Sequence, residues 1–313
     1  MWIVVGILFL VVGITILSGH FAFSITPAPS TDAPASLGTA YSDIYFINYN
    51  DELLHGWWMQ HPDASAESPL PTIILLHGWN RNCQRMIPYI KHLSMFPMNI
   101  LCIEGRGHGE NRKNNFITQV GFAHDILSAI NWLVLQPGVQ VEQIGVLGHS
   151  LGAAAAIYAG SLDKRIRFII ADASYAHPLT IIRNFLRGYH IPYLPLGWML
   201  IQYIQLRLWL SLDRIAPENV ICDLTQPVLL IHGDQDTIVP ARDSQRLLTN
   251  ANNNIDLWIA RSANHSDTPD HPEFRAVLQG FFRTHLKFSD PLSLSIARPE
   301  NTSATSDNPT TFN

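Results

Sequence analysis

Short apolar runs and stretches of helical periodicity alternate along most of the chain. Continuous apolar runs of about four to eight residues are typical of buried strands, whereas apolar positions three and four apart are typical of helices that bury one face. The expected strands are 43–49, 54–59, 72–76, 99–103, 144–147, 168–171, 228–231 and 255–259. The expected helices are 85–93, 122–135, one that starts after residue 150, 242–248 and 274–285. This alternation predicts an α/β fold in which helices cover both faces of a mostly parallel sheet.

Three terminal segments fall outside this alternation and leave a folded domain over residues 43–288. Residues 1–25 are apolar and uncharged, and they are long enough for the roughly 20 helical residues that a bilayer requires. We expect a single-span anchor, with a cleaved signal peptide and secretion as the alternative, because the positive start of a signal peptide is missing. The proline-rich residues 26–42 predict a linker. The polar residues 289–313 predict a disordered tail.

The orientation of the expected anchor depends on very few charges. No Lys or Arg occurs before Arg81, so the amino group of Met1 is the positive charge nearest to the apolar stretch. Positive charge tends to remain on the cytoplasmic side of a membrane. We therefore expect a membrane-anchored protein whose folded domain lies on the non-cytoplasmic side.

Residues 177–214 interrupt the alternation with a long aromatic and apolar block that prolines divide. A loop of this length inside a compact domain is usually functional or folded in its own right. We expect a mostly helical cap, inserted after the sixth strand. The alternative is that the block enlarges the core of the domain.

The composition of the 313-residue chain narrows the functional classes. A formal net charge of −5 provides no basic stripe for nucleic acid, which is therefore not an expected partner. The three cysteines have neither the spacing of metal ligands nor the number that a disulfide framework needs. We expect neither a metal nor an organic cofactor.

The stretch GHSLG at 148–152 follows an apolar run and precedes a run of alanines. Gly148 and Gly152 permit close approach and unusual backbone angles, so a strand can turn sharply into a helix with Ser150 at the bend. This is the arrangement of the G-x-S-x-G nucleophile elbow, which makes Ser150 the candidate nucleophile. Similar glycine-rich turns occur in nucleotide-binding folds, so a base, an acid and an oxyanion site must be found elsewhere in the chain.

A serine nucleophile needs a base, and histidine has a suitable pKa near neutral pH. Among the 14 histidines, His265 follows the last expected strand on a loop that can reach a strand end. A carboxylate must hold the base in one tautomer. Asp234 and Asp236 both follow a strand, and Asp172 ends another, so the residues themselves leave three candidates for the acid.

The tetrahedral intermediate of acyl transfer also needs backbone N–H donors. The amide of Leu151, directly after the candidate nucleophile, is one expected donor. The second expected donor is the amide of Trp79 in the stretch LLHGW, at the end of an earlier strand. His77 and His232 each precede a glycine at a strand end, and we expect both to stabilise turns.

Residues 43–285 resemble the α/β-hydrolase fold. The resemblance rests on HGW at 77–79, GHSLG at 148–152, HGDQDTIVP at 232–240 and NHSD at 264–267. The chain looks most similar to serine hydrolases akin to the catalytic domain of prolyl oligopeptidases and to small membrane-anchored relatives. In that family the second aspartate of the HGDxD stretch is the triad acid, so the resemblance selects Asp236. The chain departs from the family's D-x-R-G-H-G loop, where it has Glu104 in place of aspartate.

These observations together predict a serine hydrolase with Ser150, Asp236 and His265 as catalytic residues and the amides of Trp79 and Leu151 as the oxyanion hole. The aromatic, apolar block and the bulk of Trp79 favour an ester or thioester of a hydrophobic, lipid-like acyl group. The alternatives are a peptidase or amidase of the prolyl oligopeptidase type and a binding protein that resembles a hydrolase without turnover.

Overall fold

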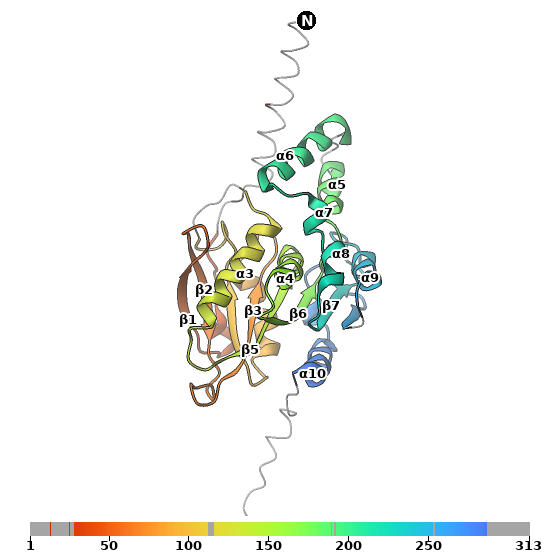
Figure 1. The fold of residues 1–313 in the computed structure, drawn as a ribbon. Helices are drawn as coiled ribbons and strands as arrows, with labels where there is room; N and C mark the ends of the chain where they lie inside the picture. The colour runs from red at the N-terminus through yellow and green to blue at the C-terminus, as the bar shows by residue number, and fades with distance from the viewer. Residues whose placement is uncertain are drawn as a thin grey trace, which may run out of the picture.

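A computed structural model describes residues 13, 25, 28–111, 116–188, 190, 192–252 and 254–286 of the chain. Its centre is one eight-stranded sheet in the order β1-β2-β4-β3-β5-β6-β7-β8 (Figure 1). The strands are β1 Ser42–Ile47, β2 Leu53–Met59, β3 Leu70–Leu76, β4 Asn99–Ile103, β5 Val139–His149, β6 Ile166–Asp172, β7 Val228–Gly233 and β8 Ile255–Ala260.

The sheet is parallel from β4 to β8 along its width, and β2 is antiparallel to both of its neighbours. β1 and β2 form a hairpin in which Ser42 pairs with Trp58 and Ile47 pairs with Leu53. β2 then pairs antiparallel with β4, and the pairs from β4–β3 to β7–β8 are all parallel. Strands buried on both faces by helices give continuous apolar runs in the sequence, which explains why these strands are predictable. The expected α/β fold is confirmed.

Helices cover both faces of this sheet. The helices that flank it are η2 Cys83–Met86, α2 Ile87–Leu93, α3 Gln119–Leu133, α4 Leu151–Leu162, α9 Arg242–Thr249 and α10 Phe274–His285. Figure 1 shows α3 and α4 in front of the sheet, where they pack against alternate side chains such as Ile74 and Val146. The other alternate set, which includes Ile73 and Leu147, packs against α2 and α10. The period of two along each strand therefore gives the protein one apolar layer on each face.

Between β6 and β7 the chain forms a series of short helices, and the first of them lie above one end of the sheet (Figure 1). They are α5 Pro178–Gly188, η3 Tyr193–Gly197, α6 Trp198–Leu208, α7 Leu212–Ile215, α8 Pro217–Val220 and η4 Ile221–Asp223. Their inward side chains form a separate apolar cluster, which includes Leu186, Ile201 and Ile204. The residues expected to form a helical cap are thus helical over most of their length.

The structure corrects the expected membrane anchor. No helix among the described residues combines the length and the apolar character needed to cross a bilayer. Since a spanning helix needs about 20 apolar residues in one run, the prediction of a transmembrane helix within residues 1–25 and of a membrane-anchored location is not supported. Of these residues the structure describes only Gly13 and Ile25, so the expected anchor lies outside the described residues, as does the expected tail at 289–313.

Gly152 in α4 provides a test of how tightly this helix approaches the sheet. A Cβ atom at Gly152 would lie 2.3 Å from the backbone oxygen of Leu76, which cannot move without breaking β3. We expect Gly152→Ala to lower the free energy of unfolding by about 3 kcal/mol or more, as overpacking of a rigid site does.

The matched control is Gly160→Ala in the same helix. A Cβ atom there would meet the flexible side-chain ends of Ile169 and Gln226 at 2.5 and 2.7 Å. Urea unfolding of both variants measures the difference. Equal losses in the two variants would contradict the close backbone contact at Gly152.

Candidate active site

Ser150 lies at a sharp turn between β5 and α4. Its backbone has φ 56° and ψ −115°, a strained conformation for a residue with a side chain. A Cβ atom at Gly148 would lie 2.2 Å from the oxygen of Gly152, and one at Gly152 would collide with β3. Both glycines are therefore required by close backbone contacts, and the turn holds the Ser150 hydroxyl at the end of the sheet.

The structure brings Ser150, His265 and Asp236 together. Nε2 of His265 lies 3.0 Å from Oγ of Ser150. Nδ1 of His265 lies 2.7 Å from Oδ2 of Asp236. The three residues follow β5, β8 and β7, and the parallel strands bring their carboxyl ends to the same edge of the sheet.

Asp236 accepts hydrogen bonds at both carboxylate oxygens. Oδ1 accepts from the amides of Ile238 and Val239 at 2.8 and 2.9 Å. Oδ2 lies 2.7 Å from His265 and 3.3 Å from Nε2 of His232. Burial alone would raise the pKa of Asp236, but the hydrogen bonds from His232 and His265 hold that pKa well below its ordinary value. The group is therefore an ionised acceptor for the Nδ1–H of His265 at neutral pH.

The other two candidate acids have different partners. Oδ1 of Asp234 accepts a hydrogen bond from the amide of Ser262 at 2.6 Å, which shapes the turn after β8. Asp172 is buried, and its Oδ2 accepts hydrogen bonds from the hydroxyls of Tyr89 and Thr268. Burial raises the pKa of Asp172. Of the three aspartates, the structure places Asp236 against the ring of His265.

The expected oxyanion donors flank the nucleophile. Leu151 is the first residue of α4, where an N–H group has no acceptor within the helix. Trp79 follows β3 and lies between two residues that buried histidines hold in place. Nδ1 of His77 donates to the oxygen of Gly78 at 2.7 Å, and Nε2 of His108 accepts from the amide of Asn80 at 3.1 Å.

Both of these histidines are neutral. Burial, and then the proximity of His108, lower the pKa of His77 well below its ordinary value. Burial lowers the pKa of His108 to about 4. A neutral imidazole donates from one nitrogen and accepts at the other, which is how each ring connects two loops. The expectation that His77 stabilises a turn agrees with these contacts.

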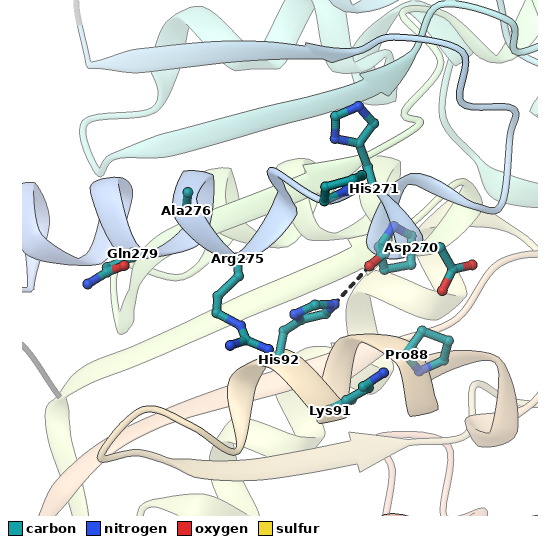
Figure 2. Close-up of a pocket in the computed structure, with 10 residues that line it drawn as sticks. Pro88, Lys91, His92, Asp270, His271, Arg275, Ala276 and Gln279 are labelled. Atoms are coloured by element: carbon teal, nitrogen blue, oxygen red, sulfur yellow. Dashed lines mark hydrogen bonds between the residues drawn. The ribbon is translucent and has the colours of Figure 1, made fainter. Parts of the chain in front are cut away.

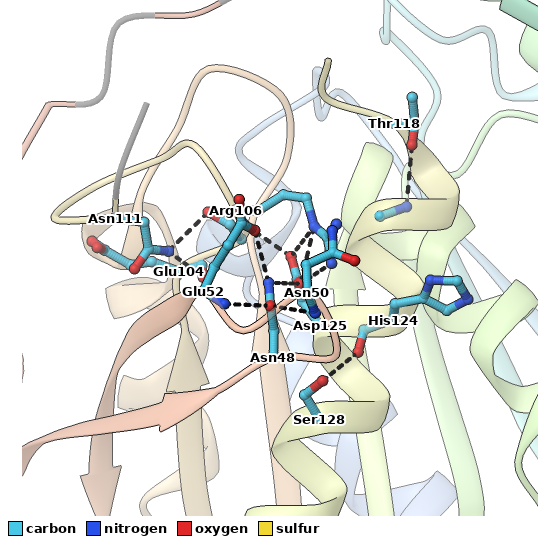
Figure 3. A network of polar contacts seen from close by, with 12 residues as sticks. Asn48, Asn50, Glu52, Glu104, Arg106, Asn111, Thr118, His124, Asp125 and Ser128 are labelled. Carbon is cyan, nitrogen blue, oxygen red and sulfur yellow. Dashed lines mark hydrogen bonds and ion pairs between the residues drawn. The ribbon is translucent and has the colours of Figure 1, made fainter. Parts of the chain in front are cut away.

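A buried polar network supports the loop that carries His108 (Figure 3). Arg106 forms an ion pair with Asp125 of α3, with 2.6 Å between Nη2 and Oδ1, and Asn48 donates to the same carboxylate. Glu104 is buried, and its Oε2 accepts a hydrogen bond from the amide of Glu110 at 2.6 Å. The glutamate that departs from the family pattern thus closes this loop through its side chain.

His55 in β2 joins this network as a charged group. Its Nδ1 lies 3.2 Å from Glu104 and its Nε2 lies 2.8 Å from Asp43. Burial alone would lower the pKa of His55, but hydrogen bonds to Glu104 and Asp43 outweigh it and raise that pKa to about 9. An imidazolium between two carboxylates therefore stabilises the loop at neutral pH.

A cavity of about 270 Å³ opens beside Ser150. Its walls are almost entirely apolar, and none of the described residues that line it carries a charged side chain. The helices between β6 and β7 contribute much of the wall, namely Ile181, Ile182, Ile204, Leu208, Leu212 and Ile215. Trp79 and Leu151 line the cavity next to the nucleophile, so the oxyanion candidates and the apolar wall belong to one space.

Three polar residues that line this cavity, Thr118, Gln119 and Tyr175, were not expected from the sequence. The hydroxyl of Tyr175 donates to Oε1 of Gln119 at 2.9 Å, and Nε2 of Gln119 donates to the oxygen of Ile215 at 2.7 Å. Gln119 thereby ties α3 to α7. The available sequence signal was Thr118, which caps α3 by accepting from Gly121 and so places Gln119 in the first turn.

A second hollow lies between α2 and α10 and contains no triad residue (Figure 2). His92 of α2 spans it by donating from Nε2 to the oxygen of Pro269 at 2.8 Å. Lys91 and Arg275 line it, and none of the described residues around it is a serine, threonine or cysteine. Within the described residues, no group of three or more His, Cys, Asp or Glu side chains is arranged to hold a metal ion. The cavity beside Ser150 is therefore the candidate active site.

Comparisons with known proteins agree with this fold. A family model described as the alpha/beta hydrolase family matches residues 73–276. The protein YfhR of Salmonella typhi is 25% identical over 253 residues, which cover 77% of this chain and 80% of YfhR. The protein YqkD of Bacillus subtilis (strain 168) is 29% identical over 216 residues, which cover 67% of this chain and 70% of YqkD.

Solved structures show the same fold. The esterase Pf2001 of Pyrococcus furiosus superposes with a TM-score of 0.66 at 23% identity, covering 83% of this chain and 99% of the esterase. The alpha/beta hydrolase GrgF from Penicillium sp. sh18 gives a TM-score of 0.62 at 19% identity, covering 80% of this chain and all of GrgF (100%). At these identities the likeness establishes the fold, as the resemblance had indicated.

The charged state of His55 predicts a pH dependence of stability. Its pKa is about 9 in the folded chain and 6.5 ordinarily, so its contribution is complete below pH 6.5 and is lost as the pH rises through about 9. We expect the loss of this contribution to lower the free energy of unfolding by up to about 3 kcal/mol as the pH rises over this range, at about 1.4 kcal/mol per pKa unit.

Urea unfolding at pH 6.5 and at about one unit above the folded pKa measures this effect. The control is His55→Gln, which keeps a polar side chain that does not titrate. The free energy of unfolding of this variant should lack the loss expected for the wild-type protein over the same pH range. Parallel pH profiles for the two proteins would show that His55 is not charged in the folded state.

Proposed function

Since the chain belongs to the alpha/beta hydrolase family, we propose that it is a serine hydrolase that cleaves an ester or thioester of a hydrophobic acyl group. The observation that carries this proposal is the chain of hydrogen bonds from Asp236 through His265 to Ser150, at the wall of an apolar cavity. The esterase Pf2001 has the same fold, and its name supports the proposal of an ester substrate.

In the acylation step, Oγ of Ser150 attacks the carbonyl carbon while Nε2 of His265 takes the hydroxyl proton. The separation of 3.0 Å between these atoms is a hydrogen-bond distance, as a general base requires. Asp236 holds the Nδ1–H tautomer and stabilises the imidazolium that forms. The imidazolium then gives its proton to the leaving oxygen or sulfur, the bond to that atom breaks, and an acyl-enzyme remains.

In the deacylation step, water repeats the attack on the acyl-enzyme. His265 takes a proton from the water and returns it to Oγ of Ser150, which releases the carboxylic acid. In both steps the carbonyl oxygen becomes negatively charged, and the amides of Leu151 and Trp79 are the proposed donors to it. Loss of one such donor typically reduces kcat by about 10²- to 10³-fold.

The cavity supports a hydrophobic acyl group as the substrate. A charged acyl group would lose its hydration there without finding a partner, because no charged side chain lines the wall. Each methylene group moved from water into such a wall contributes about 0.8 kcal/mol. The volume of about 270 Å³ is small, which favours an acyl chain of limited length over a whole lipid molecule.

The first prediction of this proposal concerns the triad. We expect a fluorophosphonate probe to label the wild-type protein and not Ser150→Ala, because the probe reacts with an activated serine. His265→Ala and Asp236→Asn should label at least about 100-fold more slowly, since the base is lost or held in the wrong tautomer. Gel fluorescence against time measures the rates.

Asp234→Asn is the matched control for the acid, because its carboxylate contacts Ser262 and not His265. It should label within about threefold of the wild-type rate, as expected for a group outside the proton path. Undiminished labelling of Ser150→Ala would refute the proposed nucleophile. A large loss in Asp234→Asn with Asp236→Asn unaffected would show that the acid is the other aspartate.

The second prediction concerns the acyl group. Leu208 lines the cavity, and Leu208→Trp should fill part of it. We expect kcat/KM for p-nitrophenyl hexanoate to fall by about tenfold, because two displaced methylene groups forfeit about 1.6 kcal/mol. The acetate ester should change by less than about threefold, since its methyl group lies next to Ser150 and gains little from the distant wall.

Leu206→Trp is the control for this substitution. It lies on the same helix with 66% of its surface exposed and does not line the cavity. Its effect on both esters should be small. Equal losses for acetate and hexanoate in Leu208→Trp would place the acyl chain elsewhere.

A further inference from the structure

His149, directly before the nucleophile, makes a contact that the proposed mechanism does not use. It is the last residue of β5 and only 2% exposed. Its Nε2 lies 2.7 Å from the backbone oxygen of His265. A carbonyl oxygen can only accept, so Nε2 carries the proton and donates it. The residue beside the nucleophile thus binds the main chain of the residue that holds the base.

The imidazole of His149 is a neutral donor over the working range of the enzyme. Burial and then the neighbouring ring of His265 lower the pKa of His149 to about 3. The hydrogen bond to His265 is therefore present at any pH at which an unprotonated base can act. The protonation state of His149 therefore stays the same over the pH range in which His265 changes its own.

The ring of His149 also occupies a junction of three segments. Its centroid lies 4.9 Å from that of His265. On the other side, a Cβ atom at Gly78 would lie 3.2 Å from Nδ1 of His149 and 3.1 Å from Cβ of Ser150. The ring therefore fills the space between the turn before Trp79, the nucleophile turn and the loop of His265, with its donor directed at the loop.

The loop of His265 is attached to neighbouring segments on both sides of the base. Before the base, Oδ1 of Asp234 accepts a hydrogen bond from the amide of Ser262, and the amide of Gln235 donates to the oxygen of Ala263. After the base, the hydroxyl of Thr268 binds Asp172. The bond from His149 acts between these two attachments, at the backbone of the catalytic residue itself.

We propose that His149 is a positioning residue that fixes the main chain of His265 and thereby keeps Nε2 of the base at proton-transfer distance from Ser150. This inference rests on the proposed function. Loss of the donor leaves the carbonyl oxygen of His265 without this bond and lets the base drift. A misplacement of about 1 Å reduces catalysis by about 10²-fold.

The test compares His149→Phe, which keeps a planar ring without a donor, with His149→Gln, whose Nε2 amide can replace the lost N–H. We expect His149→Phe to lower kcat for ethyl butyrate by about 10- to 100-fold while KM stays within about threefold, because substrate binds in the cavity and not at His149. His149→Gln should retain kcat within about threefold, because its amide restores the bond.

The leaving group provides a readout that a general structural defect would not produce. Ethoxide needs the proton of His265 to leave, whereas p-nitrophenolate leaves without one. The loss of kcat/KM in His149→Phe, which reports the acylation step, should therefore be several-fold greater for ethyl butyrate than for p-nitrophenyl butyrate. Circular dichroism and melting curves establish folding, and His149→Leu serves as a second variant without a donor if His149→Phe does not fold.

Two results would overturn the inference while the proposed function stands. One is wild-type kcat in His149→Phe on both esters. The other is an equal loss in the Gln and Phe variants that does not depend on the leaving group. A wild-type protein that neither hydrolyses the esters nor reacts with a fluorophosphonate would overturn the proposed function, and the role of His149 with it.

Discussion

The hydrogen bond between Nε2 of His265 and Oγ of Ser150 is the interaction on which the proposed chemistry depends. The local structure around Ser150 or around His265 does not by itself produce this hydrogen bond. Ser150 is held at the edge of the sheet by two glycines that allow α4 to approach β3. His265 arrives more than a hundred residues later on the loop after β8, where it meets an ionised Asp236. The parallel sheet brings these distant residues to one edge, and the loops set their distances.

Histidines support this edge in two different physical states. His77, His108 and His149 are buried and neutral, so each donates one fixed hydrogen bond and holds a loop at a set distance. His55 is charged, because two carboxylates compensate the penalty of its burial. The neutral rings border the nucleophile and the oxyanion turn, where an additional charge would change the pKa of the base. The charged ring lies farther out, under the loop that carries Glu104.

The sequence predicts the sheet well because its strands are buried on both faces. The run 99–103 is uniformly apolar apart from Asn99 and matches β4. β5 begins earlier than expected, at Val139, because residues 140–143 include two glutamines and a glutamate, are half-buried or exposed, and so interrupt the apolar run. The expected anchor at residues 1–25 is the main correction, since no described helix can span a bilayer.

The candidate site was predictable where its signals are local in the sequence. Glycines around Ser150 and a histidine after the last strand are local signals. The choice between Asp234 and Asp236 is not local, because it depends on which carboxylate the turn after β7 directs at His265. The contact of His149 depends on a loop that follows it by 116 residues, and no local pattern encodes that contact.

The most direct test of the convergence of these residues is a crystal structure of the protein after reaction with a hexyl phosphonate ester. We predict phosphorus bonded to Oγ of Ser150, the phosphonyl oxygen within hydrogen-bond distance of the amides of Leu151 and Trp79, and the hexyl chain in the apolar cavity. A phosphonate attached to another residue, or a hexyl chain directed away from the helices between β6 and β7, would contradict the account.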